Sequence, residues 1–157
     1  MQNLHTGEMR KNMKKLTTII VILLLILPIA GCGKKSTVIC TYEEGFMTAV
    51  NTLEAEGDKI VKLTYDNSAN LTEGRIDHDT MQASVDNAID LYSGTDGVSY
   101  TYEFEGDFFH ETLTFDMKTV SAADLVKMGI TSDSKSSGVS LKLTIENMEA
   151  SGFSCSK

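Results

Sequence analysis

Apolar and polar positions alternate in several short stretches of the chain, which is the pattern of β-strands that bury one face. The clearest stretch is residues 98–104, where valine and aromatic residues alternate with serine, threonine and glutamate. Residues 109–117 continue the alternation after a Glu-Gly-Asp triplet, and the same triplet separates the runs 47–55 and 59–65. Because glycine allows the tight turn that such a triplet needs, the pattern predicts two β-hairpins.

Two shorter runs predict strands near the ends of the globular region. Residues 37–42 are rich in β-branched side chains and predict an N-terminal strand, and residues 153–155 predict a short tail strand. Glu111 falls on the otherwise apolar face of the second hairpin. A charged residue at such a position is typical of either a β-bulge or an edge strand, and the pattern leaves both alternatives open.

Apolar residues at helical spacing predict a helix between the two hairpins. The residues of this stripe are Met81, Val85, Ala88, Ile89 and Tyr92. Asp79 and Gln82 fit a capping box at the start of the helix, and Gly94 fits its end. A second, short helix is predicted to begin at Ser121, with Asp124 in its first turn, and to stop at Gly129.

Residues 139–151 fit two structures. Residues 139–146 alternate as a strand does, but Leu141, Ile145 and Met148 also fall at helical spacing. The run Glu-Asn-Met-Glu-Ala-Ser-Gly is helix-forming and ends with Gly152 at a stop position, so we expect a helix here.

These elements predict an α+β fold: an antiparallel sheet of two hairpins plus an N-terminal strand, with helices packed on one face. The helix residues expected in the core are Met81, Val85, Ile89, Tyr92, Leu125, Met128, Ile145 and Met148. The sheet residues expected beneath them are Val98, Tyr100, Tyr102, Phe104, Leu113 and Phe115. The opposite, open face is expected to carry Ser99, Thr101, Glu103, His110, Thr112 and Thr114.

The N-terminus has the pattern of an export signal. Basic residues between 10 and 15 precede an apolar run at 16–29. As a helix this run would span about 21 Å, which is shorter than the apolar core of a bilayer, about 30 Å thick. The sequence Ile-Ala-Gly-Cys follows and ends at Cys32. This is the pattern of a bacterial lipobox, in which the cysteine is lipidated and becomes the new N-terminus.

The chain therefore divides into three predicted parts. Residues 1–31 form a lipoprotein signal peptide, in which 1–12 fit an upstream extension because a typical signal start lies at Met13. The start codon stays open between Met1, Met9 and Met13. Residues 32–36 are a lipidated tether, and residues 37–157 form a single α+β domain.

Charge limits the partners of the mature protein. The whole chain has 22 acidic and 14 basic side chains, and residues 1–31 contain one acidic and four basic side chains. Residues 32–157 therefore have 21 acidic and 10 basic side chains, which gives a net charge of −11. Such acidity argues against nucleic acid as a partner. It suits a domain on the extracytoplasmic face of the cell membrane, held there by the lipid on Cys32.

Two cysteines remain after lipidation of Cys32. Cys40 and Cys155 form an even pair in an oxidising compartment, and we expect them to form a disulfide; two buried thiols are the alternative. The bridge would close a loop of roughly 115 residues, which stabilises the fold by about 4–5 kcal/mol on the chain-entropy model.

Several segments carry a resemblance to a known family. They are the lipobox, the run His-Glu-Thr-Leu-Thr-Phe-Asp at 110–116 and the stretch 138–153 that begins Gly-Val-Ser-Leu-Lys-Leu. In the order of these segments along the sequence, the chain resembles the YehR-like lipoproteins, a bacterial family of uncharacterised function. The resemblance implies the lipid anchor and the fold, supports a helix at 139–151, and supplies no catalytic residues.

Motifs for catalysis or metal binding are weak. Residues 77–79 and 110–111 contain histidine and carboxylates, but a divalent metal needs three or more ligands in fixed geometry. Residues 66–72 resemble a calcium loop faintly, with Leu71 where an EF-hand needs glycine. There is no Gly-x-Ser-x-Gly motif and no phosphate-binding glycine loop. We therefore predict no catalytic residue, metal or cofactor, and no enzyme.

The sequence favours a non-catalytic binding or protein-interaction module of the cell envelope, with a small ligand or an envelope protein as partner. Phe108 and His110 are the candidate binding residues, because an exposed aromatic side chain beside a turn on the open sheet face can mark an interface; an ordinary solvent-exposed face rich in threonine is the alternative. The alternative function is an envelope hydrolase or a divalent-metal-dependent protein. An enzyme would show a cleft with converging titratable groups, and a binding module would show an apolar groove or patch.

Overall fold

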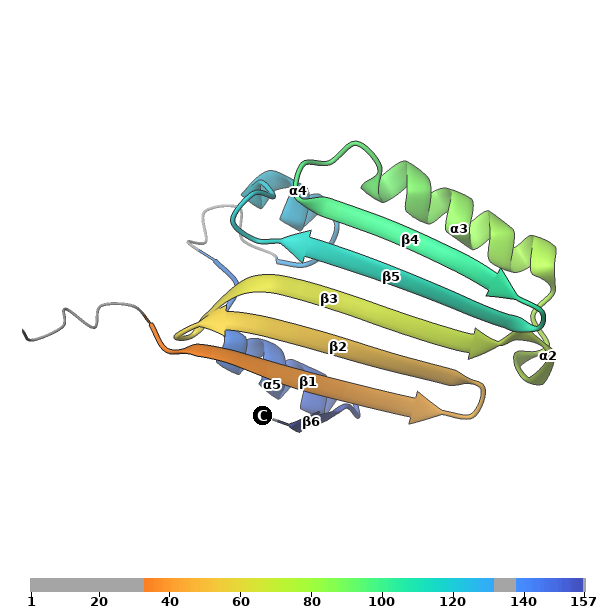
Figure 1. Ribbon diagram of the computed structural model, residues 1–157, viewed down its shortest axis with the longest axis horizontal. Helices are drawn as coiled ribbons and strands as arrows, with labels where there is room; N and C mark the ends of the chain where they lie inside the picture. The colour runs from red at the N-terminus through yellow and green to blue at the C-terminus, as the bar shows by residue number, and fades with distance from the viewer. Residues whose placement is uncertain (1–32, 132–137, 157) are drawn as a thin grey trace, which may run out of the picture. The chain divides into compact units, whose positions relative to one another are not determined.

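A six-stranded antiparallel sheet forms the central layer of the computed structural model, which describes residues 33–131 and 138–156 (Figure 1). The strand order is β4-β5-β3-β2-β1-β6. In chain order the strands are β1 (Lys35–Glu44), β2 (Met47–Glu56), β3 (Lys59–Asn70), β4 (Val98–Glu105), β5 (Phe108–Asp116) and β6 (Ser154–Ser156). The helices are α2 (Leu71–Gly74), α3 (His78–Tyr92), α4 (Ala122–Lys127) and α5 (Leu141–Ala150).

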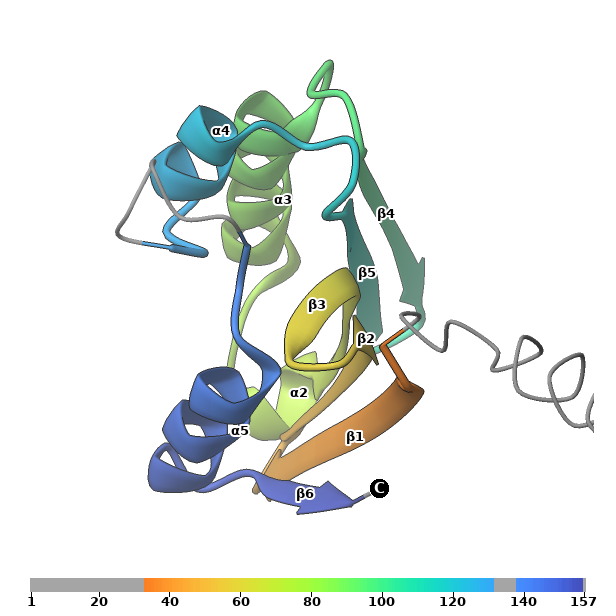
Figure 2. The same cartoon turned by 90° about the vertical axis from the view of Figure 1, so that its left-hand side faces the viewer.

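The three longer helices cover one face of the sheet and leave the other open (Figure 2). α3 and α4 lie on the half of that face formed by β4 and β5, and α5 lies on the half formed by β1 and β2. This arrangement confirms the predicted α+β class with helices on one face. The middle of the helix-covered face, which is formed by β3, lies between α3 and α5.

Strand alternation sets the core. β1, β2 and β3 form a continuous meander, and β5 pairs with both β3 and β4. Leu53, Leu63 and Phe115 occupy one row across β2, β3 and β5, and each is at most 1 % exposed. Because alternate residues of a strand point to opposite faces, this row fixes which side chains face the helices and which face solvent.

The core consists of two clusters. The larger one contains the Leu53 row together with side chains from β1, α4 and α5, and Ile145 and Met148 pack against it. The smaller one contains Leu71, Val85 and Phe109, with Met81 and Ile89 from α3 packed around it. The predicted core residues thus lie where expected, except that Tyr102 is 41 % exposed because β4 is an edge strand.

The helix that was ambiguous in the sequence is present. Ser140 is the N-cap of α5, and its side chain accepts a hydrogen bond from the backbone N–H of Leu143. Asp58, in the turn between β2 and β3, adds a second cap by accepting from the backbone N–H of Lys142 at 2.8 Å. These capping bonds satisfy N–H groups that would otherwise have no partner, and the strand alternative for this segment is therefore wrong.

Two local predictions need correction. Asp77, and not Asp79, is the N-cap of α3, because its backbone is extended and its carboxylate accepts from the backbone N–H of Thr80 at 2.8 Å. β3 continues to Asn70 and leads directly into the short helix α2, so the calcium-like segment 66–72 is not a loop. Asp66, Ser68 and Asn70 lie at alternate positions of this strand, roughly 6–7 Å from one to the next, and Asn67 points to the opposite face, so these side chains do not surround one ion as a calcium loop does.

The signal peptide, the start-codon alternatives and Cys32 lie outside the described residues. Among those that the structure describes, no helix is long and apolar enough to cross a membrane. β1 begins at Lys35, two residues earlier than the predicted strand.

Candidate functional site

The predicted disulfide is present and ties the tail strand to the sheet. Cys40 on β1 and Cys155 on β6 are directly opposed, with their Cα atoms 4.0 Å apart, and they are bonded through their sulfur atoms. The Cys40 side chain is completely buried. The bridge therefore holds the segment that follows α5 against the edge of the sheet, and so helps to position α5 above β1 and β2.

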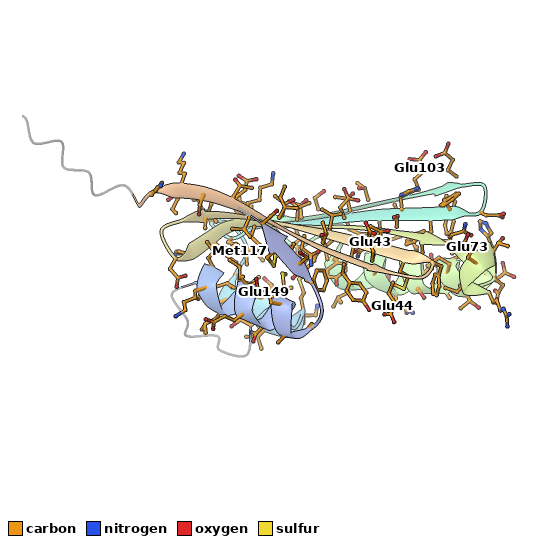
Figure 3. All side chains as sticks on the ribbon, turned by 90° about the horizontal axis from the view of Figure 1, so that it is seen from below. Glu43, Glu44, Glu73, Glu103, Met117 and Glu149 are labelled. Carbon is orange, nitrogen blue, oxygen red and sulfur yellow. A yellow bond between two sulfur atoms is a disulfide. The ribbon has the colours of Figure 1, made fainter. Side chains whose placement is uncertain are left out.

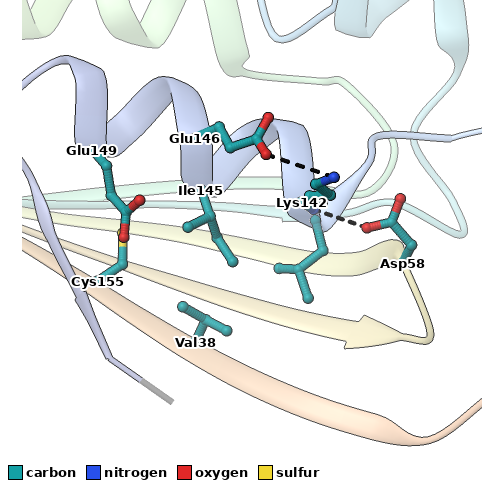
Figure 4. A pocket seen from close by; sticks show the side chains of 8 residues that line it. Val38, Asp58, Lys142, Ile145, Glu146, Glu149 and Cys155 are labelled. Carbon is teal, nitrogen blue, oxygen red and sulfur yellow. Dashed lines mark hydrogen bonds and ion pairs between the residues drawn. The ribbon is translucent and has the colours of Figure 1, made fainter.

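A hollow of about 470 Å³ lies beside this disulfide, beneath α5 (Figure 4). Three of the polar side chains that line it, Asp58, Lys142 and Glu146, already have partners within the fold. Asp58 accepts from the Lys142 backbone N–H at 2.8 Å and from the Ser140 hydroxyl at 2.7 Å, and these bonds hold its pKa below the usual range. Lys142 pairs with Glu146 at 3.8 Å along the helix. We therefore assign this hollow to the capping of α5.

A different hollow, the central groove, lies on the helix-covered face between α3 and α5. It consists of two cavities, of about 380 Å³ and about 240 Å³, which share Asn67 as a lining residue. Met148 of α5 lines the first cavity and Met81 of α3 lines the second. The polar residues of its floor come from three neighbouring strands and are Asn51, Tyr65, Asn67 and Glu111.

Asn51 has an unusual environment at the floor of this groove. It lies on β2, between two neighbouring strands of the sheet, and is 3 % exposed. Its Nδ2 donates a long contact of 3.9 Å to the sulfur of Met148, and its Oδ1 has no hydrogen-bond partner among the described residues. A buried acceptor without a partner costs about 1–3 kcal/mol, so its presence calls for an explanation.

Glu111 lies on the same floor, and its position corrects the prediction made from its charge. β5 is an interior strand, and its pairing with β3 and β4 shows no register shift, so Glu111 marks neither an edge strand nor a bulge. Its Oε1 accepts from Asn67 Nδ2 at 2.9 Å, and its Oε2 accepts from the Tyr100 hydroxyl at 2.9 Å. Two donors from the flanking strands therefore accommodate the carboxylate on a face that is otherwise apolar.

The tyrosines of this region remain protonated at neutral pH. Burial and the hydrogen bond to Glu111 raise the pKa of Tyr100 far above its ordinary value. Burial also raises the pKa of Tyr65, which lines the groove, and that of Tyr92, which contacts Tyr100. Glu111 is the one acidic residue among the described residues that line the groove, and no lysine, arginine or histidine is found among them. The groove therefore offers hydrogen bonds and a negative charge.

The open face carries the residues predicted for it. Phe108 is 49 % exposed and its ring stacks on that of His110, with centroids 6.4 Å apart and planes inclined by 19°. Glu103 is paired with His110 across the β4–β5 ladder, and Figure 3 shows Glu103 projecting from the side of the sheet opposite α5, which carries Glu149. Thr64 and Thr114 lie side by side on this face, with hydroxyl oxygens 3.4 Å apart.

Several of the candidate metal ligands have structural roles. Among the described residues, no group of three or more histidine, cysteine, aspartate or glutamate side chains is placed to hold an ion. Asp77 caps α3, and the His78 ring packs against that of Phe104 in a tilted arrangement, with ring centroids 4.8 Å apart. His110 and Glu111 are consecutive in a strand, so their side chains point to opposite faces.

Sequence reasoning missed Asn51 and Asn67 as site residues. Both occupy inward positions of strands whose other inward residues are mostly apolar, such as Leu53 on β2 and Leu63 on β3. The alternation of apolar and polar residues does contain a signal for them, because each is a polar residue at an inward strand position, as Glu111 is. The signal does not reveal that the three side chains lie near one another, because strand order decides that.

Two relatives from Listeria resemble the chain over nearly its whole length. It is 25 % identical to the uncharacterized lipoprotein Lmo0207 of Listeria monocytogenes over 147 residues, which cover 91 % of this chain and 96 % of the relative. It is 24 % identical to the uncharacterized lipoprotein Lin0239 of Listeria innocua, with the same coverage. The names of both relatives support the lipoprotein nature of this chain.

Two solved structures share the fold. The NMR structure of the Escherichia coli YehR protein superposes with a TM-score of 0.64 at 19 % identity, over 81 % of this chain and 94 % of that one. An NMR structure of a protein from Streptococcus pneumoniae TIGR4 gives a TM-score of 0.54 at 10 % identity, over 78 % and 86 %. Residues 37–154 match the model of a protein family described as "Protein of unknown function (DUF1307)". The chain therefore belongs to the DUF1307 family, and its resemblance to the YehR-like lipoproteins is confirmed.

Proposed function

We propose that this chain is a lipid-anchored, non-catalytic binding module of the cell envelope, and that its ligand lies in the central groove. The fold places a sheet floor between two helices, which is a usual arrangement for a small-molecule or peptide site. The walls of the groove are mostly apolar, with some hydroxyl and amide side chains from α3 and α5, and a few polar groups lie on its floor, as expected of a binding site.

The observation that carries this proposal is the amide oxygen of Asn51. It is buried at the floor of the groove and has no partner among the described residues. An apolar residue of similar size would remove the cost of this unsatisfied acceptor, so the fold alone gives no reason for an asparagine here. A ligand that donates a hydrogen bond to Oδ1 gives such a reason.

The anchor follows from the sequence before the described region. The short apolar run, the lipobox and Cys32 support lipidation, and the relatives named as lipoproteins agree with it. The disulfide between Cys40 and Cys155 favours an oxidising compartment, and so the extracytoplasmic face of the membrane.

The chemistry of the groove supports binding over catalysis. Both oxygens of Glu111 accept hydrogen bonds from neighbouring side chains, which holds the carboxylate in place. Tyr65 and Tyr100 have raised pKa values and stay protonated, so they act as hydrogen-bond donors and not as nucleophiles.

The test is a thermal-shift screen of the full chain in detergent with cell-wall fragments, short peptides and divalent metals. A ligand that binds the folded state raises the melting temperature, by an amount equivalent to about 2.7 kcal/mol at a hundred times its Kd. We expect a shift that Asn51→Leu abolishes and that Asn87→Leu, an exposed substitution on α3, leaves intact. An equal shift in all three proteins would contradict the groove as the site.

We further propose Phe108 and His110 as a contact point for an envelope protein. The exposed phenylalanine ring stacked on the histidine supports this role, because exposed aromatic surface beside a turn is typical of interfaces. This surface lies on the face opposite the central groove, so the two proposals can be tested separately.

A further inference from the structure

We infer that the ligand of the central groove is an extended peptide segment with a basic side chain. This inference rests on the proposed function, because it assigns a chemical class to the ligand of the same groove. Three properties of the groove support it: two side-chain amides at strand spacing, one carboxylate without a basic neighbour in the lining, and apolar hollows on either side.

The two amides have the spacing of a peptide backbone. Asn51 is paired with Tyr65 across the β2–β3 ladder, and Asn67 is paired with Ala49, so the two asparagines are diagonal neighbours on one face. Diagonal neighbours in an antiparallel pair lie about 7–8 Å apart. Alternate residues of an extended chain repeat every 6–7 Å or so. Two asparagines at this spacing can therefore each meet a peptide group on the same side of an extended ligand.

A carboxamide matches a peptide group because each has one acceptor oxygen and N–H donors. Asn51 Oδ1 is unpartnered and would accept a backbone N–H of the ligand, and its Nδ2, with only a long contact to sulfur, would donate to the neighbouring C=O. Asn67 uses one N–H for Glu111 and keeps a second N–H and its oxygen for the ligand.

The charge of the groove selects a cation. A carboxylate has about four acceptor positions, and the hydrogen bonds from Asn67 and Tyr100 use two of those on Glu111. Lysine, arginine and histidine are absent from the described residues that line the groove. A lysine or arginine of the ligand would therefore meet no competing basic side chain of the lining at Glu111. The net charge of −11 on residues 32–157 attracts such a ligand from a distance.

The hollows on either side suit apolar side chains. Met148 and Phe153 line the one next to α5, and Met81, Val85 and Phe109 line the one next to α3. Methionine adapts its shape to different partners, which suits peptides of varied sequence. When the backbone groups of an extended ligand face the floor, its side chains point alternately to the two flanks, so one row would enter the hollow next to α3, which contains Glu111, and the other row would enter the hollow next to α5.

The experiment uses the full chain in detergent micelles, with ¹⁵N on the side-chain amides of asparagine. The probe is the peptide acetyl-Val-Lys-Val-Lys-Val-amide. We expect saturable shifts of the Asn51 and Asn67 side-chain signals, and a loss of binding in Asn51→Leu. Replacement of both lysines by norleucine, or Glu111→Gln in the protein, should weaken binding about tenfold or more, because each removes a charge-assisted hydrogen bond. Glu103→Gln on the open face is the matched control and should bind as the original protein does.

Two further probes separate this inference from the proposed function. A peptide with N-methylated backbone amides should bind at least about tenfold more weakly, because it lacks the donors for Asn51. Equal binding of the lysine, norleucine and N-methylated peptides would overturn the inference. An N-acetylated oligosaccharide that binds with Asn51 dependence, where no peptide binds, would also overturn it and would leave the proposed function standing. Failure of every probe in the wider screen would overturn both.

Discussion

Asn67 on β3 donates a hydrogen bond of 2.9 Å to Glu111, the residue directly opposite it on β5. This contact explains how a carboxylate fits on the helix-covered face of an interior strand. The Tyr100 hydroxyl on β4 satisfies the other oxygen, so three neighbouring strands contribute to one polar group. The same contact places Glu111 next to the amides of the central groove.

The Tyr100–Glu111 hydrogen bond predicts a pH dependence at the alkaline end. The pKa of Tyr100 is raised in the folded state, mainly by burial and then by Glu111. A raised folded pKa gives stability that is present in full below the unfolded value of about 10 and is lost as pH rises toward the folded pKa. Unfolding in urea at pH 7 and at pH 11 should therefore show a smaller loss of stability in Tyr100→Phe than in the original protein. An identical loss in the two proteins would show that Tyr100 does not titrate in this way.

Removal of the disulfide should destabilise the fold. Cys40→Ala together with Cys155→Ala opens a loop with a sequence separation of 115 residues and should lower the free energy of unfolding by about 2–5 kcal/mol. Denaturant titration of the double variant measures the loss, and peptide mapping without reductant shows the bridge in the original protein. Two thiols that react with an alkylating agent, in protein taken directly from the envelope, would refute the bridge.

Substitution of Phe108 tests the open face. Phe108→Ser should leave the melting temperature nearly unchanged, because half of the side chain is exposed, and should weaken capture of an envelope partner in a pull-down. Thr101→Ala, on the same face of β4, is the matched control. A large drop in melting temperature for Phe108→Ser would instead show that the ring stabilises the sheet.

Substitution of the lipobox cysteine tests the anchor. Cys32→Ala should leave an unprocessed precursor or release the protein from the membrane fraction, because the acyl chains that anchor it attach at this residue. Fractionation of cells with an antibody to the chain measures both outcomes. Processing and membrane attachment that are the same as in the original protein would contradict the lipoprotein assignment of Cys32.

The elements were predictable because their signals are local. Alternation over 98–104 and 109–117 revealed the second hairpin, and helical spacing with Ser121 and Gly129 revealed α4, which begins and ends near these residues. The cap of α3 was predicted less well, because Asp77 and Asp79 both suit an N-cap and only the backbone conformation separates them.

The site was less predictable because it depends on which strands are neighbours. The chain order β3, β4, β5 does not reveal that β5 lies between β3 and β4, and only that order brings Asn67 against Glu111. Asn51 was missed although it is a polar residue at an inward position, and the environment of its amide depends on the packing of Met148 from α5. A sequence pattern shows which face a residue occupies and does not show what lies opposite it.

The melting temperature of Asn51→Leu, without ligand, tests the central claim most directly. If the amide serves a ligand and not the fold, an apolar residue of similar size should stabilise the unliganded protein by about 1 kcal/mol, because it removes a buried unsatisfied acceptor. That gain corresponds to a rise of about 3–6 °C for a domain of this size. A fall in the melting temperature would show that the Asn51 amide stabilises the fold itself, and would contradict the groove as a binding site built around it.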